Sequence, residues 1–258
     1  MNFNEYLSHQ RNVVDKEVQG WFYPIDIVLM YGILQGMQFN LDGDICEIGV
    51  ANGRSAINIC NFKNTKDNFY LYDIFSEEQR VIADNNIKKF SKGENLIWKL
   101  NDTMELFPDD LIFKDQLKFL HIDGCHEHPV VLNDLILFAD KMKDYGVIAV
   151  DDFNDWEYPG VNSAVCEFIM SKYNYKNWRI FTIGNNKAFL CQRKFHQQYQ
   201  EKLLSFIKKA MAEMNMLSFS GLTIRPVYDE NVLLCDSRSK VVDVDELYKK
   251  LFDKPTIG

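Results

Sequence analysis

Short apolar segments alternate with helix-like segments from residue 44 to residue 173, and this alternation constrains the fold more than any other feature of the sequence. The expected strands are 44–49, 69–73, 96–100, 118–123 and 147–151, and the expected helices are 54–60, 77–90, 130–142 and 161–173. Strands that alternate with helices form a parallel sheet covered on both faces. Two further strands, 178–183 and 187–192, flank the turn Gly184-Asn185-Asn186. The sequence therefore predicts an α/β protein whose seven-stranded, mostly parallel sheet ends in an antiparallel hairpin.

The two ends of the chain differ from this alternating middle. Apolar positions recur at helical spacing between Gly20 and Met37, and Pro24 suits a first helical turn. After residue 195 the pattern favours a helix to residue 216, strand-like runs at 222–228 and 231–235, and a helix at 244–252. We therefore expect an N-terminal helical segment (1–40), a central α/β domain (41–194) and a C-terminal helix with a small β/α appendage (195–258).

Charge and composition limit the partners of this chain. Its net charge is −8, and an acidic protein lacks the clustered basic surface that nucleic acids require, so a small molecule is the favoured partner. The apolar run at 24–37 is too short to span a bilayer, and the first residues lack a signal-peptide pattern. We expect a cytoplasmic protein with no membrane partner and with reduced cysteines. The pattern leaves a homo-oligomer open.

A glycine-containing turn follows the first expected strand, at the edge where open parallel sheets bind ligands. The run Glu47-Ile-Gly49-Val-Ala-Asn-Gly53-Arg-Ser55 either lets a ligand approach the backbone or is simply a tight turn. Its glycine spacing departs from the dinucleotide pattern G-x-G-x-x-G. The turn therefore disfavours NAD.

Two carboxylates follow the second and third expected strands. Asp73 is placed to accept hydrogen bonds from both hydroxyls of a ribose, because Ser76 with Gln79 is the better cap for the next helix. Asp102 is placed either to meet an adenine amino group or to cap a helix. Both residues are candidates for binding a nucleoside.

Three more carboxylates end the fourth and fifth expected strands. Asp123 lies on one of these strand ends, and Asp151 and Asp152 lie on the next. Carboxylates gathered at one edge repel one another unless protons or a cation neutralise them, and oxygen ligands favour Mg²⁺ or Mn²⁺ over zinc. The sequence therefore indicates a divalent-metal site, with a solvated acidic loop as the alternative.

Histidines and a cysteine share the loop that begins at Asp123. His126 and His128 are each possible ligands, bases or surface residues, and a histidine beside a metal and an acceptor makes a reasonable general base. Cys125 lies within the same candidate site, although packing is the commoner role of a lone cysteine. We take His126 and Asp123 as the candidate catalytic residues.

Taken in order, these motifs resemble those of the class I S-adenosylmethionine-dependent methyltransferases, within them the metal-dependent macrocin O-methyltransferase and cephalosporin-hydroxylase-like group. The resemblance spans residues 20–193 and rests on the motifs Glu47-Ile-Gly49-x-x-x-Gly53-Arg-Ser55, Asp73, Ile122-Asp123-Gly124-x-His126, Asp134, Asp151-Asp152 and Pro159-Gly160-Val161. His128 stands where the family commonly has an aromatic residue, and Asp144-Tyr145-Gly146 stands where it usually has Pro-Gly-Gly.

The resemblance implies a Rossmann-like methyltransferase sheet and a role for each motif. By this resemblance the cofactor is S-adenosylmethionine, its methionine part is lined by Glu47, Gly49, Gly53 and Ser55, and its ribose is held by Asp73. It further implies that Asp123, Asp151 and Asp152 ligate Mg²⁺ or Mn²⁺ and that His126 faces the acceptor.

The acceptor class follows from the same resemblance, which implies a saccharide, a phosphorylated compound or another polar intermediate of natural-product biosynthesis. Two alternatives stay open at this point. One is a metal-independent methyltransferase that acts on nitrogen or a carboxylate, and the other is a binding protein that keeps the cofactor fold without turnover.

Overall fold

The computed structural model describes residues 2–38, 41–214 and 221–235. The α-helices are α1 (Phe3–His9), α2 (Asp15–Glu17), α3 (Pro24–Ile33), α4 (Arg54–Cys60), α5 (Glu77–Phe90), α6 (His128–Asp140), α7 (Pro159–Met170) and α8 (His196–Met214). π-Helical turns cover Gln10–Val14 and Leu34–Gln38, and 3₁₀ turns cover Thr103–Glu105, Pro108–Asp110 and Arg193–Phe195. Within these described ranges, no helix is long and apolar enough to cross a membrane.

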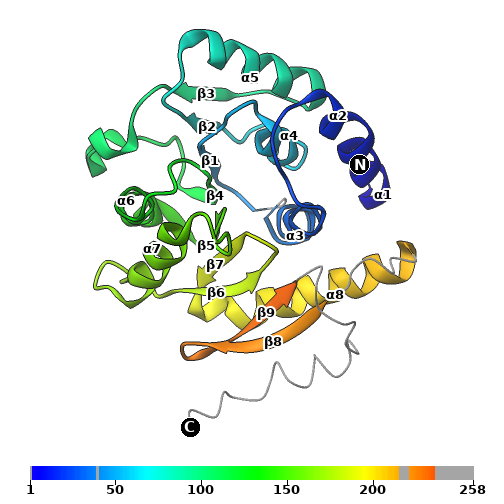
Figure 1. The fold of residues 1–258 in the computed structure, drawn as a ribbon, viewed down its shortest axis with the longest axis vertical. Helices are drawn as coiled ribbons and strands as arrows, with labels where there is room; N and C mark the ends of the chain where they lie inside the picture. Colours follow the sequence, from blue (N-terminus) through cyan, green and yellow to red (C-terminus); the bar gives the residue numbers. More distant parts are fainter. Residues whose placement is uncertain (1, 39–40, 215–220, 236–258) are drawn as a thin grey trace.

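One twisted sheet organises the described residues (Figure 1). Its strands are β1 (Asp44–Ile48), β2 (Phe69–Tyr72), β3 (Leu96–Lys99), β4 (Leu117–Ile122), β5 (Met142–Val150), β6 (Trp178–Ile183), β7 (Ala188–Gln192), β8 (Leu222–Val227) and β9 (Glu230–Cys235). They lie in the order β3-β2-β1-β4-β5-β7-β6-β9-β8, with β1 to β5 parallel and β7 antiparallel to both β5 and β6. The predicted seven strands and the C-terminal hairpin are confirmed.

The C-terminal strands extend this sheet. The runs predicted at 222–228 and 231–235 form the antiparallel pair β8–β9, and β9 lies parallel to β6. The sheet of the described residues therefore has nine strands, two more than the predicted core. The helix predicted at 244–252 lies outside the described residues.

Helices cover both faces of the sheet, as βαβ connections require. Figure 1 shows α6 and α7 on one face and α1, α3 and α4 on the other. Strands β1, β2 and β4 are buried along their whole lengths, since both of their faces pack against helices. Two hydrophobic clusters result, one on each side of the sheet. This packing brings the carboxyl ends of the parallel strands to one edge.

A capping box fixes the start of α5 just after Asp73. The Ser76 hydroxyl accepts from the Gln79 N–H, and the Gln79 side chain accepts from the Ser76 N–H. Ser76→Ala should lower the free energy of unfolding by about 1 kcal/mol, because an orphan donor of the first turn loses its acceptor. Denaturant unfolding measures this loss. Ser76→Asp, which keeps an acceptor, is the control, and an equal loss in both variants would contradict the cap.

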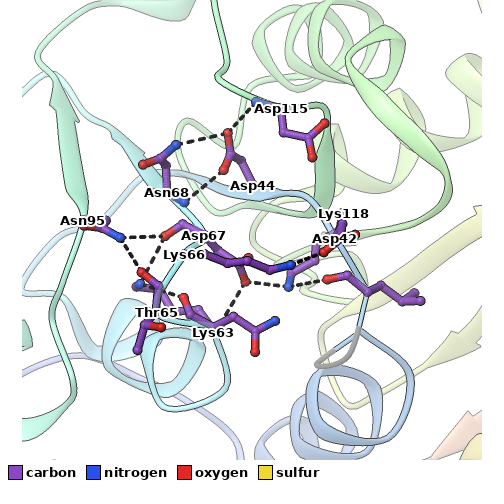
Figure 2. A network of polar contacts seen from close by, with 12 residues as sticks. Asp42, Asp44, Lys63, Thr65, Lys66, Asp67, Asn68, Asn95, Asp115 and Lys118 are labelled. Atoms are coloured by element: carbon purple, nitrogen blue, oxygen red, sulfur yellow. Dashed lines mark hydrogen bonds and ion pairs between the residues drawn. The ribbon is translucent and has the colours of Figure 1, made fainter.

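The amino ends of the strands are joined by a buried polar network (Figure 2). Lys118 on β4 is 1% exposed, and its Nζ lies 2.6 Å from Asp67 Oδ2 and 3.0 Å from the Leu41 carbonyl oxygen. At the start of β1, the carboxylate of Asp44 accepts from the N–H groups of Asn68 and Asp115. These contacts satisfy the charges of this edge internally, so the network is structural and leaves chemistry to the opposite edge.

Candidate active site

A pocket of about 440 Å³ lies at the carboxyl ends of the parallel strands. Its walls come from the ends of β1 and β2, from the segment after β3, from the loop after β4 and from α6; the lining residues are Ile48, Gly49, Ala51, Tyr72, Asp73, Ile74, Phe75, Asn101, Asp102, Thr103, Met104, Asp123, Gly124, Cys125, Val130 and Asp134. Open parallel sheets bind ligands at this edge. Of the residues predicted to bind the cofactor, Gly49, Asp73 and Asp102 line the pocket.

The backbone of the turn after β1 explains both of its glycines. Gly49 has φ +82°, and a Cβ there would lie 2.0 Å from the Asp123 carbonyl oxygen. Gly53 has φ +84° at the start of α4, where a Cβ would lie 2.9 Å from Ile87 Cγ1 on α5. Ala51 between them also has a positive φ of 45°. Close packing thus requires glycine at both positions whether or not a ligand is bound.

Asp73 holds this turn in place. Its Oδ2 accepts from the N–H of Val50 at 2.7 Å and of Ala51 at 3.3 Å, and its Oδ1 accepts from the N–H of Ile74 at 2.8 Å. Burial raises the pKa of Asp73, and the three backbone donors oppose that rise. A carboxylate offers about four acceptor positions, so one position on Oδ1 remains for a donor in the pocket.

Two carboxylates face the other side of the pocket. Asp102 accepts from the Met104 N–H at 2.9 Å and so caps the Thr103–Glu105 turn, as one of the two sequence interpretations expected. Asp134 on α6 also lines the pocket, and burial raises its pKa to about 7 against the opposing effect of the Thr103 hydroxyl. Asp102 therefore combines the capping position with a place on the pocket wall.

Glu47, Gly53 and Ser55, the other predicted cofactor residues, are not part of the pocket lining. Glu47 on β1 is fully buried, and its Oε1 pairs with His121 Nδ1 at 2.8 Å. Its Oε2 has no hydrogen-bond partner among the described residues. Ser55 is buried in the first turn of α4, two residues after Gly53. Three of the six predicted cofactor residues therefore line the pocket and three do not.

Two of the three predicted metal ligands, Asp123 and Asp151, lie close together, and Asp152 is not part of their cluster. One oxygen each of Asp123 and Asp151 and a ring nitrogen of His121 lie within 4.8 Å of one another. Burial, followed by the charge of Asp151, raises the pKa of Asp123 well above its ordinary value. Burial also favours a raised pKa for Asp151, but the Lys187 ammonium and then His121 outweigh it, so that pKa is lowered. The cluster therefore holds more negative charge than its single buried ammonium neutralises.

Asp152, next to Asp151 in the chain, has a strained backbone. It has φ +55°, a conformation that non-glycine residues rarely adopt and that gathers at functional sites. Its Oδ2 lies 3.5 Å from His126 Nε2, and its Oδ1 accepts from Asn186 Nδ2 at 3.2 Å. Burial and then the charge of Asp151 raise the pKa of Asp152. Besides burial and Asp151, the charge of Asp152 in turn raises the pKa of Asp123, so both carboxylates belong to the same edge.

The two histidines of the Asp123 loop separate. The His126 ring packs on Tyr158, with ring centroids 4.1 Å apart, beside Asp152. His128 instead begins α6, and its Nε2 lies 3.0 Å from Glu167 Oε2 on α7. The structure brings His126, and not His128, to the acidic edge.

Three polar groups of this site were not singled out by the sequence patterns. Asp26 in α3, His121 in β4 and Lys187 before β7 are all buried, and burial raises the pKa of Asp26 to about 8. Their only sequence signal is a titratable residue within an apolar segment. Titratable residues are rarely fully buried unless they are paired. Each of these three residues therefore indicated a polar or charged partner elsewhere in the chain.

Residues 46–153 match the family described as "Methyltransferase domain". The matched segment contains the last three residues of β1 and all of β2 to β5, with the pocket and the acidic edge. This match confirms the recognition that was made from the motifs, an S-adenosylmethionine-dependent methyltransferase.

Known proteins share this fold at low sequence identity. The chain is 26% identical to the uncharacterized protein R132 of Acanthamoeba polyphaga mimivirus over 170 residues, which cover 61% of this chain and 77% of that protein. The O-methyltransferase NovP has a TM-score of 0.52 and 18% identity, over 67% of this chain and 83% of its own. CalS11, a TDP-rhamnose 3'-O-methyltransferase of calicheamicin biosynthesis, has a TM-score of 0.50 and 16% identity, over 64% and 78%.

The residues at this edge fit both a nucleoside-bearing cosubstrate and a divalent ion. Three backbone N–H groups occupy three of the acceptor positions of Asp73, and the remaining position on Oδ1 suits a ribose hydroxyl. Burial, and then the charge of neighbouring carboxylates, raises the pKa values of Asp123 and Asp152, and a cation would offset the repulsion between the carboxylates. Oxygen donors of this kind suit Mg²⁺ or Mn²⁺.

Proposed function

We propose that this methyltransferase transfers the methyl group of S-adenosylmethionine to an oxygen atom of a small polar acceptor, with a divalent ion at the acidic edge formed by Asp123, Asp151 and Asp152. The observation that carries the proposal is the convergence of these carboxylates and His126 beside the pocket that contains Gly49 and Asp73. The cosubstrate pocket and the acidic edge meet at Asp123, which belongs to both.

Methyl transfer requires the protein to align three reacting atoms and to take up the proton that the acceptor loses. Methyl transfer is an in-line displacement, so the nucleophile, the methyl carbon and the sulfur must lie on one line. Asp73 and the turn at Gly49 fix the cosubstrate, and His126 accepts the proton that the acceptor oxygen releases. Asp152 lies 3.5 Å from His126 and stabilises the protonated ring. A bound divalent ion supplies polarisation of the acceptor oxygen.

A saccharide or another polyhydroxylated intermediate is the acceptor class that we propose. CalS11, which has the same fold, is named for a sugar hydroxyl. Carboxylates accept hydrogen bonds from hydroxyl groups, and the exposed ring of Trp156 follows the acidic edge in the chain. A sugar ring offers hydroxyl groups to the carboxylates and an apolar face to the Trp156 ring, so it suits both.

A metal-independent methyltransferase is the second candidate, because one observation favours it. Lys187 Nζ lies 2.5 Å from Asp151 Oδ2, so one carboxylate of the edge already has an internal counter-ion. In this case Asp123 and Asp152 would bind the acceptor directly. The two candidates differ in what happens when divalent ions are removed.

The test is a methyl-transfer assay by mass spectrometry with isotope-labelled S-adenosylmethionine and a panel of nucleotide sugars and other polyhydroxylated acceptors. Chelation should lower turnover at least about tenfold, and Mn²⁺ or Mg²⁺ should restore it, because the ion polarises the acceptor oxygen. Cosubstrate binding, measured by calorimetry, should survive chelation. Full turnover in stripped protein would exclude the metal, and methylation of an amine or a carboxylate would exclude oxygen as the target.

A further inference from the structure

Lys187 is a buried lysine in the middle of the acidic edge. It stands immediately before β7 and is 1% exposed. Its Nζ lies 2.5 Å from Asp151 Oδ2 and 3.0 Å from His121 Nε2, and it lies 5.1 Å from the centroid of the Phe22 ring. An ammonium enclosed by a carboxylate, an imidazole and an aromatic face is held in one position.

The strand register accounts for this position. Residues Glu47, His121, Ala149 and Phe189 pair across β1, β4, β5 and β7 in one row. Side chains two residues apart on a strand share a face, so Gly49, Asp123, Asp151 and Lys187 form the next row toward the site. Lys187 and Asp151 are therefore neighbours on adjacent strands, and the fold itself sets their contact.

Both oxygens of Asp151 are engaged by the chain. Oδ2 faces the Lys187 ammonium, and Oδ1 accepts from the Asp152 N–H at 3.0 Å. No ion pair with a lysine or arginine forms at Asp123 or Asp152 in the part of the chain that the structure describes. A divalent ion on Asp151 would lie next to a fixed positive charge in a buried site, where like charges repel strongly. Burial raises the pKa values of Asp123 and Asp152 and the charge of Lys187 opposes that rise, but neither of these carboxylates forms an ion pair with the ammonium.

We propose that Lys187 is the resident cation of the acidic edge, and that it holds Asp151 out of direct metal coordination, so that Asp123 and Asp152 are the carboxylates that ligate the divalent ion. This inference rests on the proposed function, because it assigns the ligands of the ion named there. Lys187 and Asp151 are positioning residues that form a neutral pair behind the two ligands.

The test measures Mn²⁺ affinity by calorimetry on the full chain. Lys187→Met/Asp151→Asn removes one charge of each sign and should leave the affinity within about threefold, because the pair adds neither a ligand nor net charge. Lys187→Met alone should tighten Mn²⁺ binding by at least about tenfold, since Asp151 becomes available as a further ligand. Asp123→Asn should weaken binding by at least about tenfold through loss of a ligand.

The buried pair at the opposite edge is the matched control. Lys118→Met/Asp67→Asn removes a pair of the same chemistry, with side chains 1% and 2% exposed, and should leave Mn²⁺ affinity unchanged. Lys187→Met leaves Asp151 buried without its cation, which can destabilise the fold. The thermal unfolding midpoint of this variant is therefore also measured. Added Mn²⁺ should raise that midpoint more than it raises the midpoint of the unmodified chain.

Two results overturn the inference. One is a tenfold or greater loss of Mn²⁺ affinity in Lys187→Met/Asp151→Asn while the unmodified chain binds, since Asp151 would then be a direct ligand. The other is a Lys187→Met variant that gains neither affinity nor stabilisation by Mn²⁺ while the double variant folds. If neither the unmodified chain nor any variant binds Mn²⁺, the metal part of the proposed function fails instead. Methyl transfer itself is then judged separately by the mass-spectrometric assay.

Discussion

Replacing His126 by alanine is expected to slow methyl transfer by about 10²- to 10⁴-fold, the usual contribution of a positioned general base. His126 is the one histidine of its loop that lies at the acidic edge, 3.5 Å from Asp152 and packed on Tyr158. Its ring is thereby oriented by a carboxylate, as catalytic bases commonly are. Cosubstrate and acceptor binding should change little, because neither Asp73 nor the turn at Gly49 contacts this ring.

Single-turnover rates at saturating Mn²⁺ separate this role from an indirect one. If the imidazole only orients Asp152, the variant should bind the ion more weakly and excess ion should restore the rate. His128→Ala is the matched control, because His128 shares the loop but pairs with Glu167 on α7, away from the acids. A near-normal single-turnover rate for His126→Ala would exclude the general base and leave proton removal to solvent or to a carboxylate.

The alternation of strands and helices made the architecture predictable. Every expected strand of the parallel region is present, because strands such as β1 and β4 are mostly apolar and wholly buried, and acids or glycine follow their ends. Once β1, β4 and β5 are parallel neighbours, Asp123, Asp151 and the turn at Gly49 must share an edge. The position of the site therefore followed from local patterns.

The contacts between residues within the site could not be predicted from local sequence patterns. Lys187 meets Asp151 because β7 pairs antiparallel with β5, and this register is a tertiary property. The need for glycine at position 49 arises from the Asp123 carbonyl oxygen, which comes from a strand far along the chain. Two further strands, β8 and β9, join the sheet through β6, although their sequences show only strand-like character. Contacts between distant segments decide each of these features.

Asp73→Ala is expected to weaken binding of S-adenosylhomocysteine by about 2 to 4 kcal/mol, which is roughly one hydrogen bond to a charged group together with the loss of order in the turn at Gly49. This corresponds to about 30- to 700-fold in the dissociation constant. The sequence suggested hydrogen bonds from both ribose hydroxyls. The structure leaves one acceptor position on Oδ1 for the ligand, because Val50, Ala51 and Ile74 occupy the others. The loss should therefore combine one ribose contact with the disordering of the turn at Gly49.

Asp73→Asn distinguishes these contributions from simple loss of charge. The asparagine amide has the same size as the carboxylate, but its N–H₂ group replaces one of the two acceptor oxygens. It therefore cannot accept hydrogen bonds from the N–H groups of Val50, Ala51 and Ile74 together. Its affinity should fall nearly as far as that of Asp73→Ala. Asp84→Ala is the control, since Asp84 bonds Trp98 and Lys88, is not among the pocket-lining residues, and should leave affinity unchanged. Calorimetry that finds unaltered affinity in folded Asp73→Ala would remove the carboxylate from the cosubstrate site, because neither a ribose bond nor an ordered turn could then depend on it.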